Sequence, residues 1–293
     1  MAGRLAILLL RKEAVALKAD CHMHAILDGY EWRGAIARHA QKPDIGWIRN
    51  MLKTYQSFGY TYLRDGGDRW GAGAAARTLA PEYGITYRTP LAPLCKAGHY
   101  GSFIGAVWGD LAEYAALVRS HKKAGADFIK IMISGLMDFD HFGVLTEPGL
   151  PPEEIRELIH IAHGEGMAVM AHCNGASTAQ AAAKAGVDSI EHGAYLDEEA
   201  LAAMAENGVV WVPTLSTIGN LRGKGRFSEA DVQKILESAL ENLSRYKGPV
   251  APGTDAGAWA VPHGSETEIP LLAQAGITEE RLAKGIAVIQ EKF

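Results

Sequence analysis

Cysteine and long apolar runs are both scarce in this chain of 293 residues. Three cysteines, an odd number, do not make a disulfide framework, so a reducing cytoplasm is the expected compartment. The apolar run at residues 5–10 is interrupted by Arg11 and is too short for the core of a signal peptide. No later run reaches the about 18 consecutive apolar residues of a membrane span, which predicts a protein without a membrane partner.

An excess of positive charge is also missing. The chain carries 29 Lys and Arg against 34 Asp and Glu, a net charge of −5, with no basic cluster. Nucleic-acid binding needs a basic face, so we expect a small-molecule substrate instead, and a homo-oligomer is left open. Apolar residues make up 48% of the chain and no linker rich in Pro, Gly or Ser divides it. These features predict one globular domain over residues 1–293.

Apolar runs of strand length alternate with amphipathic runs of helix length, which is typical of an α/β fold with a parallel sheet. The predicted strands end near His24, Asp65, Leu94, Ile133, His172, Glu191, Thr214 and Thr254. The predicted helices span residues 44–58, 70–82, 109–125, 151–166, 174–185, 197–207, 228–246 and 265–276. Eight of each predict a closed (β/α)8 TIM barrel, whose long loops after the strands build the site.

The run Asp20-Cys21-His22-Met23-His24 is the strongest local motif. Side chains two apart on a strand share a face, and two imidazoles on one face make half of a zinc site. Taken alone, the pair is better explained as two polar residues near a strand end. The interpretation changes because later apolar runs end at four more residues of suitable type: Lys130, His172, His192 and Asp255. Alternation predicts that Cys21 and Cys173 face the helices.

Lys130 and Asp255 each allow two interpretations. A buried lysine could reach a carboxylate such as Asp255, or its neutral amine could react with CO₂ to give a carbamate that bridges two metals. Asp255 could cap a turn beside its glycines, or bind a metal and accept a proton from bound water. A metal lowers the pKa of water from about 15.7 to about 7, which yields hydroxide at neutral pH.

Several weaker candidates lie on loops after strands. We predict substrate contacts for four of them, with an ordinary loop role as the alternative: His99, Tyr100, His141 and His263. Glu191 should alternate away from His192 and serve packing or a hydrogen bond to a ligand. Arg64 is interpreted as an ion pair at the barrel rim.

The sequence resembles the amidohydrolase superfamily, in its imidazolonepropionase-related and Xaa-Pro dipeptidase-like branch. The matching segments are DCHMH, GADFIKIM, MAVMAHCNG, VDSIEHGAYLD and GTDAG followed by PHG. The resemblance implies two divalent metal ions, with zinc expected. His22, His24 and Asp255 would hold one ion and His172 and His192 the other, bridged by a carbamate on Lys130. It also implies hydrolysis of an amide or related C–N bond, with Asp255 as the proton shuttle.

Many members of this superfamily carry a small accessory β-sandwich, which we expect to be absent or vestigial here. Three alternatives to amide hydrolysis stay open: a lactonase or phosphotriesterase-like hydrolase, a mononuclear deaminase of the same fold, and a non-catalytic barrel scaffold. The deaminase is disfavoured because no H-x-x-E motif follows the fifth or sixth strand. The scaffold is disfavoured because all six candidate ligands are present.

Overall fold

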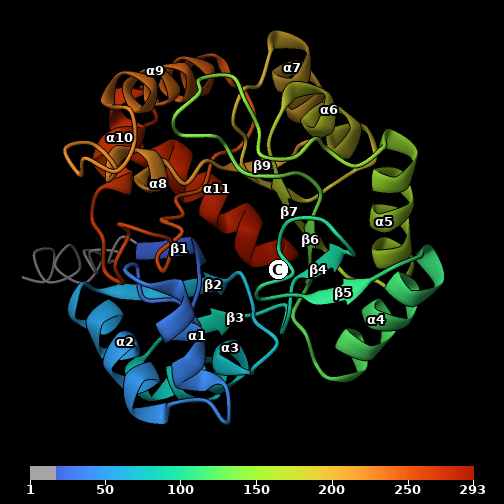
Figure 1. The fold of residues 1–293 in the computed structure, drawn as a ribbon, viewed down its shortest axis with the longest axis vertical. Coiled ribbons are helices and arrows are strands. Elements are labelled where there is room, and N and C mark those ends of the chain that lie inside the picture. Colours follow the sequence, from blue (N-terminus) through green and yellow to red (C-terminus); the bar gives the residue numbers. More distant parts are fainter. Residues whose placement is uncertain (1–17) are drawn as a thin grey trace, which may run out of the picture.

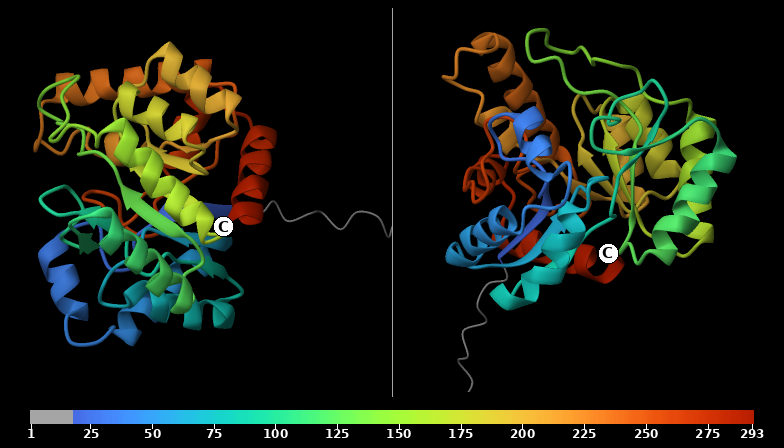
Figure 2. Two further views of the ribbon diagram at one scale, coloured as in Figure 1. Left: turned by 90° about the vertical axis from the view of Figure 1, so that its right-hand side faces the viewer. Right: turned by 60° about the horizontal axis from the view of Figure 1, so that its bottom comes forward.

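The computed structural model describes residues 18–293, so the apolar run at residues 5–10 lies outside the described residues (Figure 1). Helices surround a central set of strands in all three views (Figures 1 and 2). No helix within residues 18–293 is long and apolar enough to cross a membrane. The assignment of residues 1–293 to one domain stays a prediction.

Residues 18–293 contain nine strands, and every pairing between them is parallel. They are β1 (Lys18–Met23), β2 (Tyr60–Asp65), β3 (Thr86–Arg88), β4 (Leu94–Lys96), β5 (Ala106–Trp108), β6 (Ile129–Met132), β7 (Val169–Cys173), β8 (Ser189–His192) and β9 (Val210–Val212). The strands form two sheets, ordered β1-β2-β3 and β5-β4-β6-β7-β8-β9, rather than one continuously hydrogen-bonded cylinder.

The predicted third strand is split in two. β3 pairs with β2, whereas β4 pairs with β6, so each half belongs to a different sheet. The intervening segment contains Pro90 and Pro93, which offer no backbone N–H to a ladder, and Leu91 has a φ of 68°. The prediction of a single strand ending near Leu94 is therefore wrong, because two separate strands occupy this segment.

The predicted eighth strand, ending near Thr254, is also not a regular strand. The segment nevertheless bonds to both neighbours: Trp211 N–H donates to the Pro249 carbonyl, and Cys21 N–H donates to the Pro252 carbonyl. Asp255 N–H in turn donates to the carbonyl of His22. The segment thus spans the gap between β9 and β1 and places Asp255 beside the end of β1.

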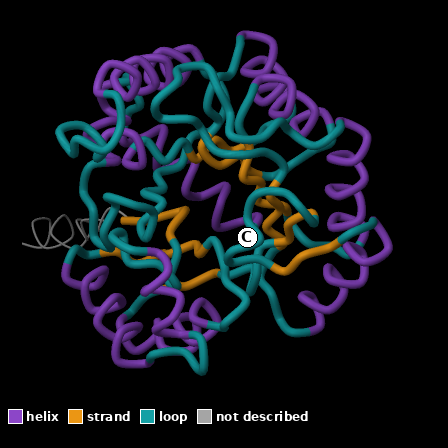
Figure 3. The backbone as a smooth tube through the Cα atoms, in the orientation of Figure 1, coloured by secondary structure: helices purple, strands orange, loops and turns teal. Residues whose placement is uncertain are grey.

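The helices, purple in Figure 3, form the outer layer, except for α11. They are α1 (Trp32–His39), α2 (Ile45–Ser57), α3 (Ala72–Leu79), the 3-10 helix η1 (Ala80–Tyr83), α4 (Leu111–Lys123), α5 (Pro152–Gly164), α6 (Ala176–Lys184), α7 (Glu198–Glu206), α8 (Ser216–Gly219), α9 (Glu229–Arg245), α10 (Glu268–Gln274) and α11 (Glu279–Lys292). The eight predicted helices are present within a few residues, whereas α1, α8 and α11 were not predicted.

α11 packs against β1 and β9 and crosses the middle of the ring of strands (Figure 3). Its Ile286 and Ile289, together with Phe293, join an interior cluster that includes Ala19 of β1 and Val210 of β9. Because these strand residues lie near the starts of their strands, α11 closes the amino-terminal end of the barrel. The carboxyl-terminal end, where the predicted ligands lie, stays on the opposite side.

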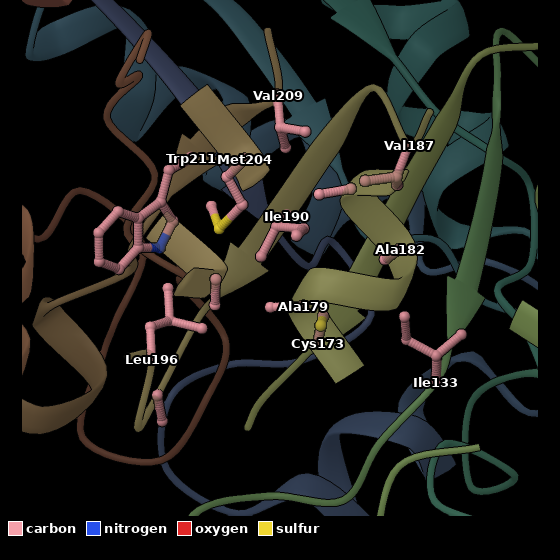
Figure 4. Close-up of a cluster of buried hydrophobic side chains, with 14 of the residues drawn as sticks. Ile133, Cys173, Ala179, Ala182, Val187, Ile190, Leu196, Met204, Val209 and Trp211 are labelled. Atoms are coloured by element: carbon pink, nitrogen blue, oxygen red, sulfur yellow. The ribbon is translucent and has the colours of Figure 1, made fainter. Parts of the chain in front are cut away.

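A larger cluster fills the layer between strands and helices. There Cys173 of β7 packs with Ala179 and Ala182 of α6 (Figure 4), so it faces the helices as predicted. Cys21 instead belongs to the interior cluster, and the same prediction for it is wrong. The pairing register of β1 shifts between Asp20 and Met23, which breaks the regular alternation of side chains.

Candidate metal centre

The six predicted ligands meet at the carboxyl end of the barrel. His22 and His24 come from the end of β1, Lys130 from β6, His172 from β7, His192 from β8 and Asp255 from the loop that follows the irregular eighth segment. All but His22 line one cavity of about 570 Å³. His22 lies directly beneath, with its Nε2 3.1 Å from Lys130 Nζ and 3.6 Å from Asp255 Oδ1.

The four imidazoles form a continuous group. Ring centroids are 5.4 Å apart for His22 and His24, 5.1 Å for His22 and His192, and 4.5 Å for His172 and His192. Burial, followed by the nearby Lys130 charge, lowers the pKa of His22, His24 and His172 well under its usual value. Burial, followed by its histidine neighbours, does the same for the pKa of His192. Neutral imidazoles are the form that binds metal.

Hydrogen bonds at the back of three rings determine which nitrogen faces the site. His22 Nδ1 lies 2.7 Å from Glu191 Oε2, and His172 Nε2 lies 3.1 Å from the carbonyl of Gly135. A carboxylate and a carbonyl can only accept, so His22 Nε2 and His172 Nδ1 keep free lone pairs. His192 Nδ1 contacts Thr214 Oγ1 at 2.7 Å, which leaves its Nε2 for the interior.

The charges of Lys130, which is buried, and Asp255, which is partly exposed to the cavity, act on each other. Burial lowers the pKa of the Lys130 ammonium, and the charge of Asp255 opposes this shift. Burial raises the pKa of Asp255, and Lys130 opposes that shift. A lowered lysine pKa increases the fraction of free amine, the form that reacts with CO₂.

Two of the candidate ligands occupy left-handed backbone conformations. φ is 68° at His192 and 55° at Asp255. Such conformations in residues other than glycine cost of the order of 1 kcal/mol and cluster at functional sites. The left-handed conformation changes where the His192 side chain points. In a regular strand, alternation would direct the His192 side chain to the face opposite that of Glu191. Both residues instead contact His22, so the prediction that Glu191 alternates away from His192 is wrong.

The residues present fit a metal site. Ligand atoms of His22, His192 and Asp255 all lie within 4.8 Å of one another. His24 Nδ1 is buried without a hydrogen-bond partner in the described structure, while its Nε2 lies 3.4 Å from Asp255 Oδ1. Histidine nitrogens and a carboxylate are the donors that zinc binds.

The predicted substrate residues lie in different places. Tyr100 lines the cavity, with its ring 4.8 Å from that of His172. His99 stands outside it near Glu147, and His141 is 70% exposed and paired with Asp138. His263 Nε2 donates to the Leu27 carbonyl, behind the cavity wall. Tyr100 is thus part of the cavity lining and the other three side chains are not, and a substrate contact stays a prediction for all four.

Sequence reasoning missed the aromatic walls of the cavity. One wall is formed by Trp32, the first residue of α1, and Phe103, from the loop after β4, whose ring centroids are 5.6 Å apart. The other combines Phe139, Phe227 and Trp259 from three further loops, with centroids 5.3 Å and 6.0 Å apart along the series. Loop aromatics carry no periodic signal, although their position after predicted strands placed them on the correct face.

Two arginines also line the cavity. Arg33 lies over the Trp32 ring at 4.3 Å, and Arg226 lies over the Trp259 ring at 4.4 Å. A guanidinium stacked on an aromatic face keeps its N–H edge available for a carboxylate. The cavity therefore combines apolar walls, two cations near its mouth and a histidine-rich floor.

Arg64 is not at the rim, contrary to the sequence interpretation. It is completely buried inside the barrel, where Nη2 donates to Glu191 Oε1 at 2.8 Å and Nε donates to the Cys21 carbonyl at 2.7 Å. Glu191 is also completely buried and receives a further hydrogen bond from Ser189 Oγ. Burial raises the pKa of Glu191, and Arg64 opposes this shift.

Comparison with known proteins assigns this chain to a known protein family. The amidohydrolase family matches residues 78–272, about two thirds of the chain, so this chain belongs to the amidohydrolase family. Its curated relatives include ochratoxinase of Aspergillus niger, 27% identical over 274 residues that cover 80% of this chain and 55% of the relative. An uncharacterized protein of Mycobacterium tuberculosis is 32% identical over 179 residues, covering 58% of this chain and 47% of that protein. The chain thus spans about half the length of the curated relatives it matches.

Solved structures show the same fold. A Xaa-Pro dipeptidase with bound methionine aligns with a TM-score of 0.74 and 21% identity, covering 94% of this chain and 76% of that one. The structure of A. niger ochratoxinase aligns with a TM-score of 0.70 and 24% identity, covering 92% and 69%. These neighbours are TIM barrels, which confirms the predicted fold class, although the described strands do not close into one hydrogen-bonded cylinder.

Proposed function

We propose that this chain is a metal-dependent hydrolase that cleaves an amide or related C–N bond. One observation carries the proposal: six side chains of ligand type, from five separate segments, converge at the floor of a 570 Å³ cavity. Membership of the amidohydrolase family supports the reaction class. Cavities of about 300–1,000 Å³ are typical of small-molecule sites.

In this proposal His22, His24 and Asp255 would hold one divalent cation, His172 and His192 would hold a second, and a carbamate on Lys130 would supply oxygen ligands to the pair. Zinc is the expected metal. When bound, the cations supply Lewis-acid activation of water and of the scissile carbonyl. The carbamate forms when the Lys130 amine attacks CO₂ and releases one proton, and the lowered pKa of Lys130 favours that amine.

Asp255 would act as the proton shuttle. Its Oδ1 lies 3.6 Å from His22 Nε2 and 3.4 Å from His24 Nε2, at the edge of the cavity. The carboxylate accepts a proton from the attacking water and transfers it to the leaving amine. Burial raises the pKa of Asp255 toward the working range of a general base, which suits both halves of this transfer.

The lining supports a substrate with apolar groups and a carboxylate. Aromatic walls suit bulky side chains on both sides of the amide, and the stacked Arg226 suits an anionic end. Relatives named ochratoxinase and Xaa-Pro dipeptidase fit this substrate range. We therefore propose dipeptides or N-acyl amino acids as substrates, with cyclic amides as a further group to assay.

Metal content and turnover together test the proposal. The full chain, supplied with zinc, should hold two equivalents and hydrolyse members of a panel of N-acyl amino acids, Xaa-Pro dipeptides, cyclic amides and lactones. Asp255→Asn should lower kcat by at least about 100-fold while the protein stays folded. Preference for lactones would favour the lactonase alternative, one equivalent of zinc the deaminase, and a folded protein without zinc the scaffold.

Arg226→Gln tests the substrate assignment separately. With a pair of substrates that differ only in a terminal carboxylate or carboxamide, it should raise KM for the carboxylate about 10-fold or more and leave the carboxamide unchanged. Arg222→Gln, on the same loop but outside the cavity lining, is the matched control. Equal effects of the two variants would remove the carboxylate from the proposal.

A further inference from the structure

A completely buried ion pair lies directly beneath the candidate metal centre. Arg64 of β2 and Glu191 of β8 are joined by a 2.8 Å contact, and both side chains are fully shielded from solvent. Arg64 makes two further hydrogen bonds, from Nη1 to Ser189 Oγ at 2.9 Å and from Nε to the Cys21 carbonyl. All three donating nitrogens of the guanidinium are thereby satisfied.

Stability alone is a weak explanation for this pair. Removing two charges from water costs several kcal/mol per ion, and apolar replacements of buried pairs are often neutral or stabilising. Two aromatic rings offset part of that cost, because the Arg64 guanidinium lies 4.5 Å from the ring centroid of Phe293 and 5.9 Å from that of Phe128, within cation–π range. A functional contact would account for a charge kept in such a place.

The functional contact is the one between Glu191 Oε2 and the imidazole of His22. Glu191 Oε1 accepts from Arg64 and from Ser189 Oγ, so Oε2 is left to face His22 Nδ1 at 2.7 Å. The acceptor fixes the proton of the neutral imidazole on Nδ1. Nε2 is then the lone-pair nitrogen, and it is the atom that lies near Lys130 Nζ and Asp255 Oδ1.

We propose that Glu191, held in place by Arg64, is the positioning residue that sets the tautomer and orientation of His22 for metal binding. The inference rests on the proposed metal-dependent function, but it concerns residues that hold no metal themselves. Glu191 lies on β8 just before the left-handed residue His192, and both side chains lie against His22. One strand end therefore supplies both a metal ligand and the group that orients another ligand.

Glu191→Gln is the sharpest perturbation, because it keeps the shape and removes one acceptor. Arg64 and His22 Nδ1–H both require an acceptor, and the amide offers a single oxygen. If that oxygen stays with Arg64, the amide NH₂ faces His22 Nδ1 and drives the proton to Nε2. The nitrogen needed for metal is then blocked. Loss of such an orienting partner lowers metal affinity by about 10- to 100-fold.

Two readouts test this on the full chain. Nitrogen-15 NMR of metal-free protein, with His22 assigned by comparison with His22→Gln, should show the Nδ1–H tautomer in the wild type and Nε2–H in Glu191→Gln. Zinc affinity, from competition with a chromophoric chelator, should fall at least about 10-fold in the variant. A wild type that already shows Nε2–H overturns the proposal without relying on any variant.

Glu268→Gln is the matched control. Glu268 is also buried and accepts hydrogen bonds from Leu215 N–H and Ser216 N–H, but it does not contact a histidine. It should leave the His22 tautomer unchanged and zinc affinity within about twofold. Unchanged zinc affinity in Glu191→Gln, or an equal loss in both variants, would contradict a positioning role. Wild-type protein that binds zinc with the Nδ1–H tautomer yet hydrolyses no amide would overturn only the proposed function.

Discussion

Gly66 lies against the imidazole of His24, and one added methyl group at this position should displace that ring. A Cβ built on Gly66 would stand 2.1 Å from His24 Cε1 and 2.5 Å from its Nε2. Carbon atoms in contact lie about 3.5–4.0 Å apart, so the ring must move by more than about 1 Å. Because His24 lines the cavity, the ring can be displaced toward that space.

The expected cost of Gly66→Ala follows from these distances. Overpacking a buried site costs about 1–3 kcal/mol of the free energy of unfolding. His24 Nε2 would also leave its position 3.4 Å from Asp255 Oδ1, and a 1 Å misplacement of such a group can cost about 100-fold in kcat/KM. Denaturant unfolding, zinc competition and turnover measure the three effects.

Gly164→Ala is the control for the glycine substitution itself. Gly164 ends α5, and a Cβ there would meet nothing within 4 Å. This change should stabilise the chain by about 0.4–1 kcal/mol and leave zinc binding unchanged. If Gly66→Ala binds zinc and unfolds like the wild type, the packing of His24 against Gly66 does not position the ligand, and the reasoning is wrong.

Three further predictions concern stability and the cavity. Burial raises the pKa of Glu268 to about 8, so the folded state holds a proton that the unfolded state releases above about 4.5. The free energy of unfolding should therefore fall as pH rises between these values, by up to about 1.4 kcal/mol per unit, and unfolding of Glu268→Gln at several pH values should lack this component. Ile190→Ala removes a completely buried side chain of the main core and should cost about 2–5 kcal/mol in urea unfolding. His141→Ala should leave KM within about twofold, because this exposed side chain is not part of the cavity lining; a larger change would restore the sequence prediction of a substrate contact.

The sequence predicted the fold well where elements are regular. The amphipathic runs located all eight predicted helices, including α5. The sequence did not predict the helices whose formation depends on contacts with distant parts of the chain. α1 lies in a segment that looks like a loop, and its start is fixed by the Glu31 side chain accepting from Arg33 N–H and Gly34 N–H. α11 was not predicted, although its apolar residues close the amino-terminal end of the barrel.

The candidate site was predictable in its residue types and less so in its geometry. Histidine, lysine and aspartate at the ends of apolar runs identified side chains that do converge, because parallel strands all end at one face of a barrel. A hydrogen bond from Glu191 to a candidate ligand was one of the two roles predicted for it, and that contact is present, but the place of Arg64 was not predictable. Arg64 looks like a rim residue beside Asp65, and only the fold shows that it is buried against Glu191.

Several departures from regular strand geometry lie at the candidate ligands. The register of β1 shifts between Asp20 and Met23, around His22. The last residue of β8, His192, is left-handed, and so is Asp255 after the eighth segment. A regular strand sends adjacent side chains to opposite faces, so it could not direct both Glu191 and His192 toward His22. Irregular backbone at these points lets more polar groups reach the centre than eight ideal strands would allow. Simple alternation rules therefore fail at the site because the site requires a backbone that departs from them.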